Sequence, residues 1–575
     1  MPHSWRSRLS KFRRRISRNE SVVRWLGLSR AEGIQQQPGL ILVQIDGLSR
    51  HQFERALKKR RMPFLRKLAR KRNYRIHSLY SGLPSSTPAV QGELFYGVRC
   101  AVPAFSFRDH ESGQIVRMFD AAPARSVQEK LASLGPGLLE GGSAYSNIYS
   151  GGAAVSHFCA ATMGWNNVAS VIKPWVLASI IFWHAWSILR TLTLVLVELW
   201  LVLWDFMRGE TARTTLWNEF KFIFLRVGVC VVMRELITVG ASVDATRGLS
   251  VIHLNYLGYD EQAHHRGPSS HFAHWSLKGI DDAIKRVWNA ARRSQHRKYT
   301  LWVYSDHGQE RTIPYLHKFG RPIQQAIADI FGEDVIAHPA GRVPASSGVQ
   351  HGRAQWVGGR AGERITHHQR GSEGAHHVAD SGLRTAPVVD VVSLGPIGHV
   401  YPREALSAER MDEIAREMVH KAGVSMVLAP TAAGEARAWT RSGTFQLPAQ
   451  AAAVFGINHP FLVDVTRDMI DLCHHPHSGA FILGGWSLEG PALTFALENG
   501  SHCGPGIEET RAFVFVPADA PVPEKEQGYL RPLDLRLAAL RQMGRTCVID
   551  SQTGNCQASE AEAPADLALT TGSEG

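Results

Sequence analysis

The hydrophobic and polar positions of this chain predict several short buried strands. Apolar, β-branched runs at residues 40–45, 249–254 and 299–304 each end abruptly in polar residues, and a fourth run covers residues 512–516. Runs of this length and composition are typical of strands that are covered on both faces. The four segments therefore predict a buried β-sheet.

Helix-like segments lie between these runs, at residues 53–72, 271–293 and 408–422. Strands that alternate with helices are typical of a parallel sheet that helices cover. The predicted fold class is α/β, with a mainly parallel sheet sandwiched by helices.

The most apolar part of the chain lies between residues 168 and 207, where Lys173, Arg190, Glu198 and Asp205 are the only charges. Each half is about sixteen or seventeen residues long, slightly short of the roughly twenty that a straight membrane span needs, and its tryptophans suit an interfacial belt. We expect an apolar helical insertion over residues 166–245 that associates with a membrane as a hairpin or interfacial helix pair. A buried helical insertion or a dimer interface is the alternative.

This insertion divides the predicted catalytic α/β domain into a first part, residues 39–165, and a second part, residues 246–547. A segment rich in Gly, Arg and His near residues 345–380 has no periodicity and predicts a loop-rich insertion. Residues 1–38 form a basic N-terminal arm. Residues 548–575 are expected to be a disordered tail.

Charge and cysteine content narrow the class of protein. The 575 residues include 64 Lys+Arg and 51 Asp+Glu, a net charge of +13, and nine of the basic residues lie within the first thirty. Such a basic arm is typical of an anchor to anionic lipid and equally of a solvated tail. No apolar run long enough for an export signal follows it. No motif for reading nucleic acid accompanies the charge, so no specific nucleic-acid binding is expected.

The odd number of cysteines, seven, without a CxxC pair, argues against a disulfide framework and a structural zinc module.

Acidic residues and histidines follow the predicted strands. Asp46 ends the first strand, Asp306 and His307 end the third, and the second leads into Asp260 and His264. Ligands gather at the carboxyl ends of parallel strands, so these side chains are expected at one edge of the sheet. A carboxylate and an imidazole four residues apart on a helical turn or tight loop point the same way, as two ligands of one divalent metal must.

A glycine-rich loop before the last strand contains His502, which is a third candidate ligand for the metal of Asp260 and His264. The neighbouring Cys503 could also bind a metal, but an isolated cysteine in a loop is more often a bystander.

A pair of hydroxyls, Ser86 and Thr87, precedes Pro88 and a helix-like run. The ordinary interpretation is a helix cap. The alternative is a nucleophile, because a hydroxyl bound to zinc loses its proton near neutral pH and a helix N-terminus favours an arriving phosphoryl group.

The order of these motifs resembles the alkaline phosphatase superfamily, and most closely its type I phosphodiesterase and nucleotide pyrophosphatase branch. That branch has a metal-binding Asp at the end of a strand, a Thr or Ser nucleophile two residues before a proline, and the motifs D-x-x-x-H-x-x-G-P and S-D-H-G. The matching residues are Asp46; Ser86 before Pro88, with Thr87 as the alternative nucleophile; Asp260, His264, Gly267 and Pro268; and Ser305, Asp306, His307 and Gly308. His502 matches the final metal-binding histidine loosely, because Cys503 stands where glycine is expected. A sulfatase is not favoured, since Ser86 and Val90 replace the Cys and Arg of its C-x-P-x-R pattern.

The resemblance implies a two-metal site that hydrolyses phosphoesters through a covalent phospho-enzyme on Ser86 or Thr87. Zinc is the expected metal, and the ligand types alone leave manganese and magnesium open. The resemblance assigns Asp46, Asp306 and His307 to one ion, and Asp260, His264 and His502 to the other.

We therefore expect a membrane-associated, metal-dependent phosphodiesterase or nucleotide pyrophosphatase that acts on a phosphodiester or nucleotide-type substrate, possibly lipid-linked. A phosphomonoesterase, a headgroup phosphotransferase and a non-catalytic membrane-bound scaffold are the alternatives. The Arg-rich flank before the insertion favours the cytoplasmic face of the membrane for the catalytic domain.

Overall fold

The computed structural model describes residues 23–24, 27–30, 38–162, 193, 228–332, 389–549 and 556–560. Most of the basic arm, most of the predicted apolar insertion and the whole of the loop-rich segment at 345–380 lie outside these residues. Within the described parts of the chain, no helix combines the length and the apolar character that a membrane crossing requires.

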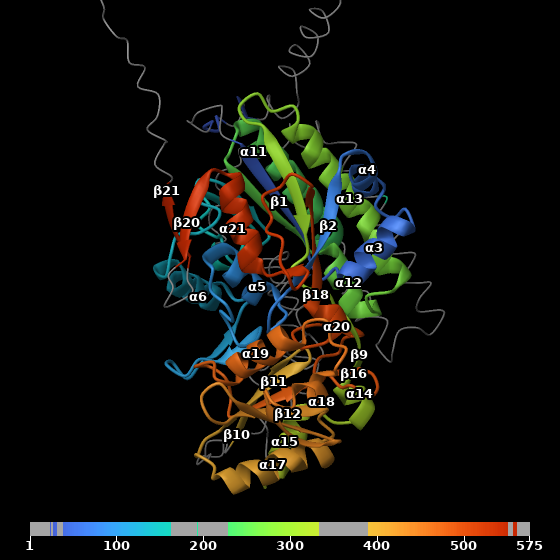
Figure 1. The fold of residues 1–575 in the computed structure, drawn as a ribbon, viewed down its shortest axis with the longest axis vertical. Coiled ribbons are helices and arrows are strands. Elements are labelled where there is room, and N and C mark those ends of the chain that lie inside the picture. Colours follow the sequence, from blue (N-terminus) through green and yellow to red (C-terminus); the bar gives the residue numbers. More distant parts are fainter. Residues whose placement is uncertain are drawn as a thin grey trace, which may run out of the picture.

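A sheet of eight strands forms the larger body of the molecule (Figure 1). In spatial order its strands are β19 (Tyr529–Leu530), β2 (Tyr74–Tyr80), β18 (Arg511–Pro517), β8 (Tyr299–Tyr304), β1 (Gly39–Ile45), β7 (Val251–Tyr256), β5 (Ser143–Tyr145) and β6 (Val155–His157). Strands β8, β1, β7, β5 and β6 pair in parallel, and β18 runs antiparallel to both of its neighbours. The predicted α/β fold with a mainly parallel sheet is confirmed.

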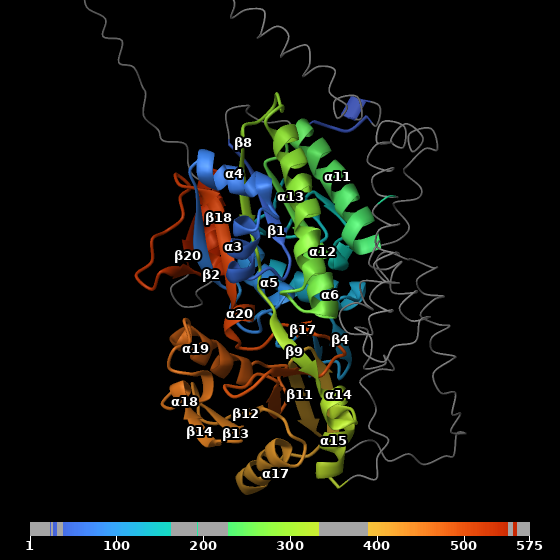
Figure 2. The ribbon, with the colours of Figure 1, turned by 90° about the vertical axis from the view of Figure 1, so that its right-hand side faces the viewer.

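Helices cover both faces of this sheet. Successive residues of a strand point to opposite sides, so a continuous apolar strand has a hydrophobic core on each face. In β1, Leu40 and Leu42 belong to the core on one face, and Ile41 and Val43 belong to the core on the other. The first core is closed by α5 (Thr87–Tyr96), α6 (Ala121–Ser133) and α21 (Pro532–Gln542), and the second by α3 (Arg50–Lys58), α4 (Pro63–Lys71), α11 (Arg234–Arg247) and α13 (His271–Ala291). Figure 1 shows α21, α5 and α6 to the left of the sheet and α3, α4 and α13 to the right, and Figure 2 shows α11 beside α13.

The single helix predicted at residues 53–72 is two helices, α3 and α4. Pro63 is the first residue of α4. Proline has no N–H and clashes with the preceding turn, so it fits the start of a helix and interrupts one that would continue through it. The helix predicted at 271–293 corresponds to α13.

A second, smaller body follows, which lies within the second part of the predicted catalytic domain and whose sheet was not predicted. It contains a sheet of six antiparallel strands. In spatial order these are β10 (Val389–Leu394), β11 (Ile397–Pro402), β15 (Phe481–Gly484), β12 (Met426–Pro430), β13 (Ala436–Thr440) and β14 (Gly443–Leu447). Helices α15 (Ile323–Ile330) and α17 (Ala408–His420) pack on one face, and α18 (Ala451–Phe455) and α19 (Leu462–Cys473) contribute to the core shared with the larger body.

Three small sheets complete the described fold, one of which pairs β3 (Ser106–Arg108) with β4 (Ile115–Arg117). Strand β9 (Glu310–Pro314) pairs with β16 (Ala492–Thr494) and β17 (Gly500–Ser501) between the two bodies (Figure 2). Near the C-terminus, β20 (Arg545–Ile549) pairs with β21 (Cys556–Glu560). The latter strand lies within the tail for which the sequence analysis expected no ordered structure.

Candidate metal centre and nucleophile

Three neighbouring strands bring the predicted acids together. Asp46 directly follows β1, and Asp306 and His307 follow β8. Asp260 lies in α12 (Gly258–Arg266), the helix that follows β7. Because β8, β1 and β7 are adjacent and parallel, these residues meet at the same edge of the sheet. All three carboxylates are fully buried.

The first group of candidate ligands consists of Asp46, Asp306 and His307, whose ligand atoms lie within 4.8 Å of one another. The His307 Nε2 atom is 3.3 Å from Asp306 Oδ2 and 3.5 Å from Asp46 Oδ1. This is the set that the resemblance implies for one metal ion.

The second group consists of Asp260, His307 and His502, also within 4.8 Å of one another. His307 therefore lies between the two groups, and its ring stacks on that of His502 with 3.7 Å between centroids. His264 lies next to this group, with its Nε2 atom 3.3 Å from Asp260 Oδ2. The structure thus brings all six predicted ligands into one cluster but gives His307 a more central position than the sequence suggested.

Thr87 points into this cluster and Ser86 does not hydrogen-bond to it. The Thr87 Oγ1 atom lies 3.3 Å from His307 Nε2 and 3.4 Å from Asp46 Oδ1. Ser86 is the N-cap residue of α5, yet its side chain makes no capping bond, and its buried Oγ has no hydrogen-bond partner among the described residues. Of the two hydroxyls that the sequence offered, the geometry favours Thr87 as the one beside the ligands.

The three histidines share one orientation. Each Nδ1 atom lies 2.9 Å from a backbone carbonyl oxygen: His264 from that of Gly500, His307 from that of Gly308, and His502 from that of Ser85. A carbonyl oxygen can only accept, so each Nδ1 carries a ring proton, and in the neutral form of the ring Nε2 then presents a lone pair. This is the tautomer that a metal ion binds.

The donor set fits divalent metal ions. Asp306 Oδ2 is buried and accepts no hydrogen bond from the described residues, and His264 Nε2 is in the same situation despite the nearby Asp260 carboxylate. Buried polar atoms rarely stay unbonded, because desolvation costs roughly 1–3 kcal/mol or more. Carboxylate oxygens and imidazole nitrogens are ligands that zinc accepts.

Burial controls protonation in the cluster. It raises the pKa of Asp306 to about 7, and the nearby charge of Asp260 acts in the same direction. Burial also lowers the pKa of His307 and, with the help of the neighbouring His307 ring, lowers that of His502 well below its usual range. For His264, burial acts downward, but the carboxylates of Glu498 and Asp260 outweigh it and raise the pKa. The surroundings of Asp306 therefore disfavour its ionised form, which a cation bound beside it would stabilise.

Several supporting residues were not found from the sequence. Gln309 donates to Asp260 Oδ1 at 2.5 Å, Asn255 donates to Asp46 Oδ2 at 3.0 Å, and Glu498 Oε2 lies 3.2 Å from His264 Nδ1. Gln309 follows a ligand motif, Glu498 follows β16 and Asn255 lies within β7, but an isolated Gln, Glu or Asn at these places has no distinctive spacing. Gly47, at φ +69°, is required by close packing, since a Cβ atom there would stand 2.2 Å from Asp260 Oδ1.

Cys503 adopts a φ of +114° and is buried. The region of positive φ favours glycine, which is the residue that the resemblance led us to expect at this position. Its Sγ atom belongs to neither group of candidate ligands.

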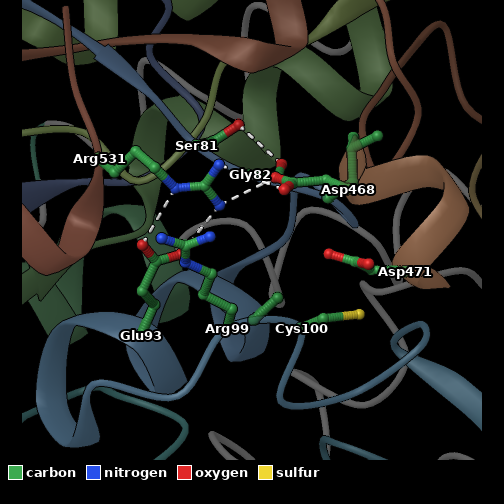
Figure 3. A pocket seen from close by; sticks show the side chains of 10 residues that line it. Ser81, Gly82, Glu93, Arg99, Cys100, Asp468, Asp471 and Arg531 are labelled. Carbon is green, nitrogen blue, oxygen red and sulfur yellow. Dashed lines mark hydrogen bonds and ion pairs between the residues drawn. The ribbon is translucent and has the colours of Figure 1, made fainter. Parts of the chain in front are cut away.

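Besides the candidate metal ligands, a second buried cluster of charged side chains surrounds Arg531 (Figure 3). The guanidinium donates to Glu93 of α5 and to Asp464 and Asp468 of α19, at distances of 2.9 to 3.5 Å. It also lies 5.1 Å from the ring centroid of Tyr80. A small pocket of about 10 Å³ lies beside these groups. This Arg531 cluster joins α5 of the larger body, the helix that begins with Thr87, to α19 of the smaller body.

The chain is similar to known proteins in sequence and in structure. The family model of type I phosphodiesterases / nucleotide pyrophosphatases matches residues 40–421. Among solved structures, the phosphonoacetate hydrolase of Sinorhizobium meliloti 1021 in complex with phosphonoformate is 13% identical, with a TM-score of 0.45, covering 88% of this chain and 96% of that one. The murine ectonucleotide pyrophosphatase / phosphodiesterase 5 is 11% identical, with a TM-score of 0.42, covering 88% of this chain and 95% of that one. No curated protein matches the chain. Because the family model covers more than half of its length, the chain belongs to the type I phosphodiesterase / nucleotide pyrophosphatase family and is a phosphoric ester hydrolase of that type.

Proposed function

We propose that the chain is a two-metal phosphodiesterase or nucleotide pyrophosphatase in which Thr87 is the nucleophile. The observation that carries this proposal is the position of Thr87 Oγ1 at the start of α5, between Asp46 Oδ1 and His307 Nε2. Ser86, the other candidate, has no contact of this kind among the described residues.

The metal ligands would divide as the resemblance implies, with His307 positioned between the two sets. Asp46, Asp306 and His307 would hold one ion, and Asp260, His264 and His502 the other. Bound divalent ions, for which we propose zinc, supply Lewis-acid stabilisation of phosphoryl oxygens and lower the pKa of a bound hydroxyl.

The chain's own residues orient the attack. The Asp46 carboxylate lies within reach of the Thr87 hydroxyl, so it orients the oxygen and accepts its proton or hydrogen bond. Thr87 Oγ1 forms a bond to phosphorus while the bond to the leaving alcohol or phosphate breaks. Water then cleaves the phosphothreonine bond, which restores the hydroxyl and releases the second product. The N-terminus of α5 favours the anionic group during both steps.

Variants of the two hydroxyls test this proposal with a chromogenic phosphodiester and its monoester as substrates. Removing the nucleophile by Thr87→Ala should lower kcat/KM at least about 1,000-fold. The matched Thr87→Ser variant keeps a hydroxyl and should retain more activity than Thr87→Ala. Mass spectrometry of acid-quenched enzyme should find the phosphoryl group on Thr87, both in the wild type and in Ser86→Ala.

Two results would contradict the assignment. Phosphorylation of Ser86 with normal turnover in Thr87→Ala would make Ser86 the nucleophile. Faster cleavage of the monoester than of the diester would favour the phosphomonoesterase alternative, and no chelator-sensitive cleavage of either ester would favour the scaffold.

We also propose that the chain associates with the cytoplasmic face of a membrane and that its substrate is lipid-linked. The support is the apolar composition of residues 166–245 and the basic arm before them. Co-sedimentation with vesicles that contain anionic lipid tests the association, and a tag-accessibility assay tests the side. Absence of the protein from the vesicle pellet, with and without anionic lipid, would contradict it.

A further inference from the structure

Four buried polar side chains lie where α5 packs on the large sheet. Each is at most 1% exposed, and none belongs to either group of candidate metal ligands. This set, the Gln91 network, comprises Gln91 of α5, Gln44 of β1, Tyr304 of β8 and His253 of β7. The surrounding residues form one of the two hydrophobic cores, where polar groups cost free energy unless they bond to one another.

One backbone donor fixes the direction of every hydrogen bond in the Gln91 network. The Ile148 N–H donates to Gln91 Oε1 at 2.9 Å, so Gln91 Nε2 faces Gln44 and donates to its Oε1 at 3.1 Å. The Tyr304 hydroxyl lies 3.1 Å from the same Gln44 oxygen, which can only accept, so the hydroxyl donates as well. The hydroxyl proton is then used, and His253 Nε2, at 2.7 Å, donates to the hydroxyl oxygen. The network therefore has a single arrangement of donors and acceptors.

The Gln91 network contacts the face of α5 that carries the proposed nucleophile. Thr87, Gln91 and Phe95 are spaced four residues apart, which places them on one side of the helix. Phe95 packs edge-on against the ring of His253, with 4.9 Å between centroids. This side of α5 therefore meets the sheet along its whole length, with Gln91 in the middle.

Strand β1 leads both to the acceptor of Gln91 and to the ligand beside Thr87. Gln44 and Asp46 are two residues apart, so their side chains project on the same side of the extended chain. Along α5, Gln91 and Thr87 are about one turn apart, roughly 6 Å along the axis. The bond of Gln91 to Gln44 and the contact of Thr87 with Asp46 are therefore consecutive contacts between one helix and one strand.

A directional contact is needed here because the reaction depends on the rotation of the helix. Hydrophobic burial has no preferred direction, whereas a hydrogen bond weakens steeply when its donor turns away. Ser86 directly precedes Thr87, and one residue of an α-helix corresponds to a rotation of about 100°. Misplacement of a reacting atom by about 1 Å is enough to slow a reaction about 100-fold.

We propose that Gln91 and Gln44 are positioning residues whose hydrogen bond fixes the rotation of α5 on β1, so that Thr87 and not Ser86 faces the metal ligands. This inference rests on the proposed function. Two atoms of the network, Gln44 Nε2 and His253 Nδ1, have no hydrogen-bond partner among the described residues. The network is thus not the most stable way to fill this space, and what it adds to an apolar core is one defined arrangement.

The test replaces each glutamine by methionine, which has a similar length and no N–H donor. Gln91→Met and Gln44→Met should each lower kcat for the chromogenic diester about 100-fold, with KM changed less than about threefold and the metal content unchanged. Acid-quenched enzyme should carry part of its phosphoryl group on Ser86 in both variants and only on Thr87 in the wild type. The double variant should be no slower than the single ones, because both substitutions remove the same hydrogen bond.

Tyr96→Phe is the matched control. Tyr96 lies in α5, is buried, and hydrogen-bonds to Ser150 and Gly151 in the loop after β5 instead of to the sheet. Its variant also loses buried hydrogen bonds of this helix, so it should lower the melting temperature but leave kcat and the phosphorylated residue unchanged. If a methionine variant does not fold, Tyr304→Phe, which removes one hydroxyl bond to Gln44, gives the comparison.

The outcomes separate this inference from the proposed function. In a wild type that forms phosphothreonine at Thr87, a normal kcat in both methionine variants would overturn the inference alone. Additive losses in the double variant, or an equal loss in Tyr96→Phe, would also overturn it, because they indicate a general weakening of the core. A wild type that is phosphorylated on Ser86, or that cleaves no ester, would contradict the proposed function and the inference together.

Discussion

Two buried clusters of carboxylates lie along helix α5, and they differ in how their charge is balanced. At the N-terminus of the helix, Asp46 and Asp306 lie beside Thr87 and histidines. Towards its C-terminus, Glu93 belongs to the Arg531 cluster, where one guanidinium bonds to three carboxylates. In the first cluster, burial lowers the pKa of His307 and His502, so these two imidazoles are poor counter-charges, whereas the second cluster has its own permanent cation. The difference indicates an ion-binding site in one case and a structural joint in the other.

The protonation behaviour of the two clusters follows from this difference. Burial raises the pKa of Asp306 to about 7, so its ionised form is disfavoured by its surroundings. Arg531 shows the opposite pattern, because the charges of Glu93 and Asp468 outweigh its burial and raise its pKa well above the usual value. A carboxylate that lacks a cation of the protein is available to a metal, and one that already has a cation is not.

The largest expected effect comes from removing a charge in the first cluster. Asp306→Asn should lower kcat/KM at least about 1,000-fold, about 4 kcal/mol, because it removes an anionic ligand. Metal analysis should find less bound metal, while the melting temperature of the metal-free protein stays the same or rises. Bound metal at the wild-type level would show that Asp306 is no ligand.

Removing the cation of the second cluster should act on stability instead. Arg531→Met leaves three buried carboxylates without their partner, and breaking such a buried network costs about 3–5 kcal/mol of unfolding free energy. Denaturant unfolding measures this loss. The control is Lys525→Met, because Lys525 bonds to Asp534 in a more exposed ion pair, for which roughly 1 kcal/mol or less is expected.

Equal stability losses in these two variants would remove the distinction between the clusters. Such a result would mean that the carboxylates around Arg531 become protonated or hydrated at little cost.

Metal ions should stabilise the folded protein through the first cluster alone. At a free metal concentration of one hundred times the dissociation constant, binding adds about 2.7 kcal/mol to the free energy of unfolding. Chelation should therefore lower the melting temperature of the wild type more than that of Asp306→Asn, in which only the second ion keeps its full set of ligands. A chelation effect as large in Asp306→Asn as in the wild type would place the stabilising ion elsewhere.

The strands and the candidate ligands could be predicted because each depends on local sequence. Strand β8 has the bounds that its apolar run suggested, and Asp306 follows it directly. The acids after neighbouring parallel strands must meet at one edge, whatever the rest of the chain does. The apolar pattern of short segments and one rule of sheet geometry were sufficient to predict these strands and the acidic residues at their ends.

Other features depend on contacts that the sequence does not display. The choice between Ser86 and Thr87 depends on how α5 is rotated against β1, and a motif gives no rotation. The six-stranded sheet was missed because its antiparallel pairs join segments as distant as β12 and β15. Arg531 meets Glu93 across more than four hundred residues, so neither the joint nor its charge balance could be foreseen.

The smallest predicted effect per step of the measurement, one pH unit, concerns a third carboxyl group, Glu509, which lies beside the acid Glu310 and has no cation as its partner. Glu509 accepts hydrogen bonds from the Gly504 and Gly506 N–H groups at 2.8 Å, in the loop that carries His502. Burial and the charge of Glu310 raise its pKa to about 8. Between the unfolded value of 4.5 and about 8, the folded protein holds a proton that the unfolded chain has released, so the free energy of unfolding falls as pH rises.

The contribution of this group is at most about 1.4 kcal/mol per pH unit. Denaturant unfolding of the chelated protein at pH 5, 6, 7 and 8 should show this decline in the wild type and a shallower one in Glu509→Gln, which cannot ionise. The matched variant is Asp534→Asn, which removes a carboxylate that bonds to Lys525 and to the Arg531 N–H and so controls for the loss of a carboxyl group in general. A wild-type slope that Glu509→Gln does not reduce would mean that Glu509 is ionised in the folded protein, stabilised by the two N–H groups as effectively as by a cation. The difference between the clusters would then depend on the N–H donors around each carboxylate as much as on the presence of a cation.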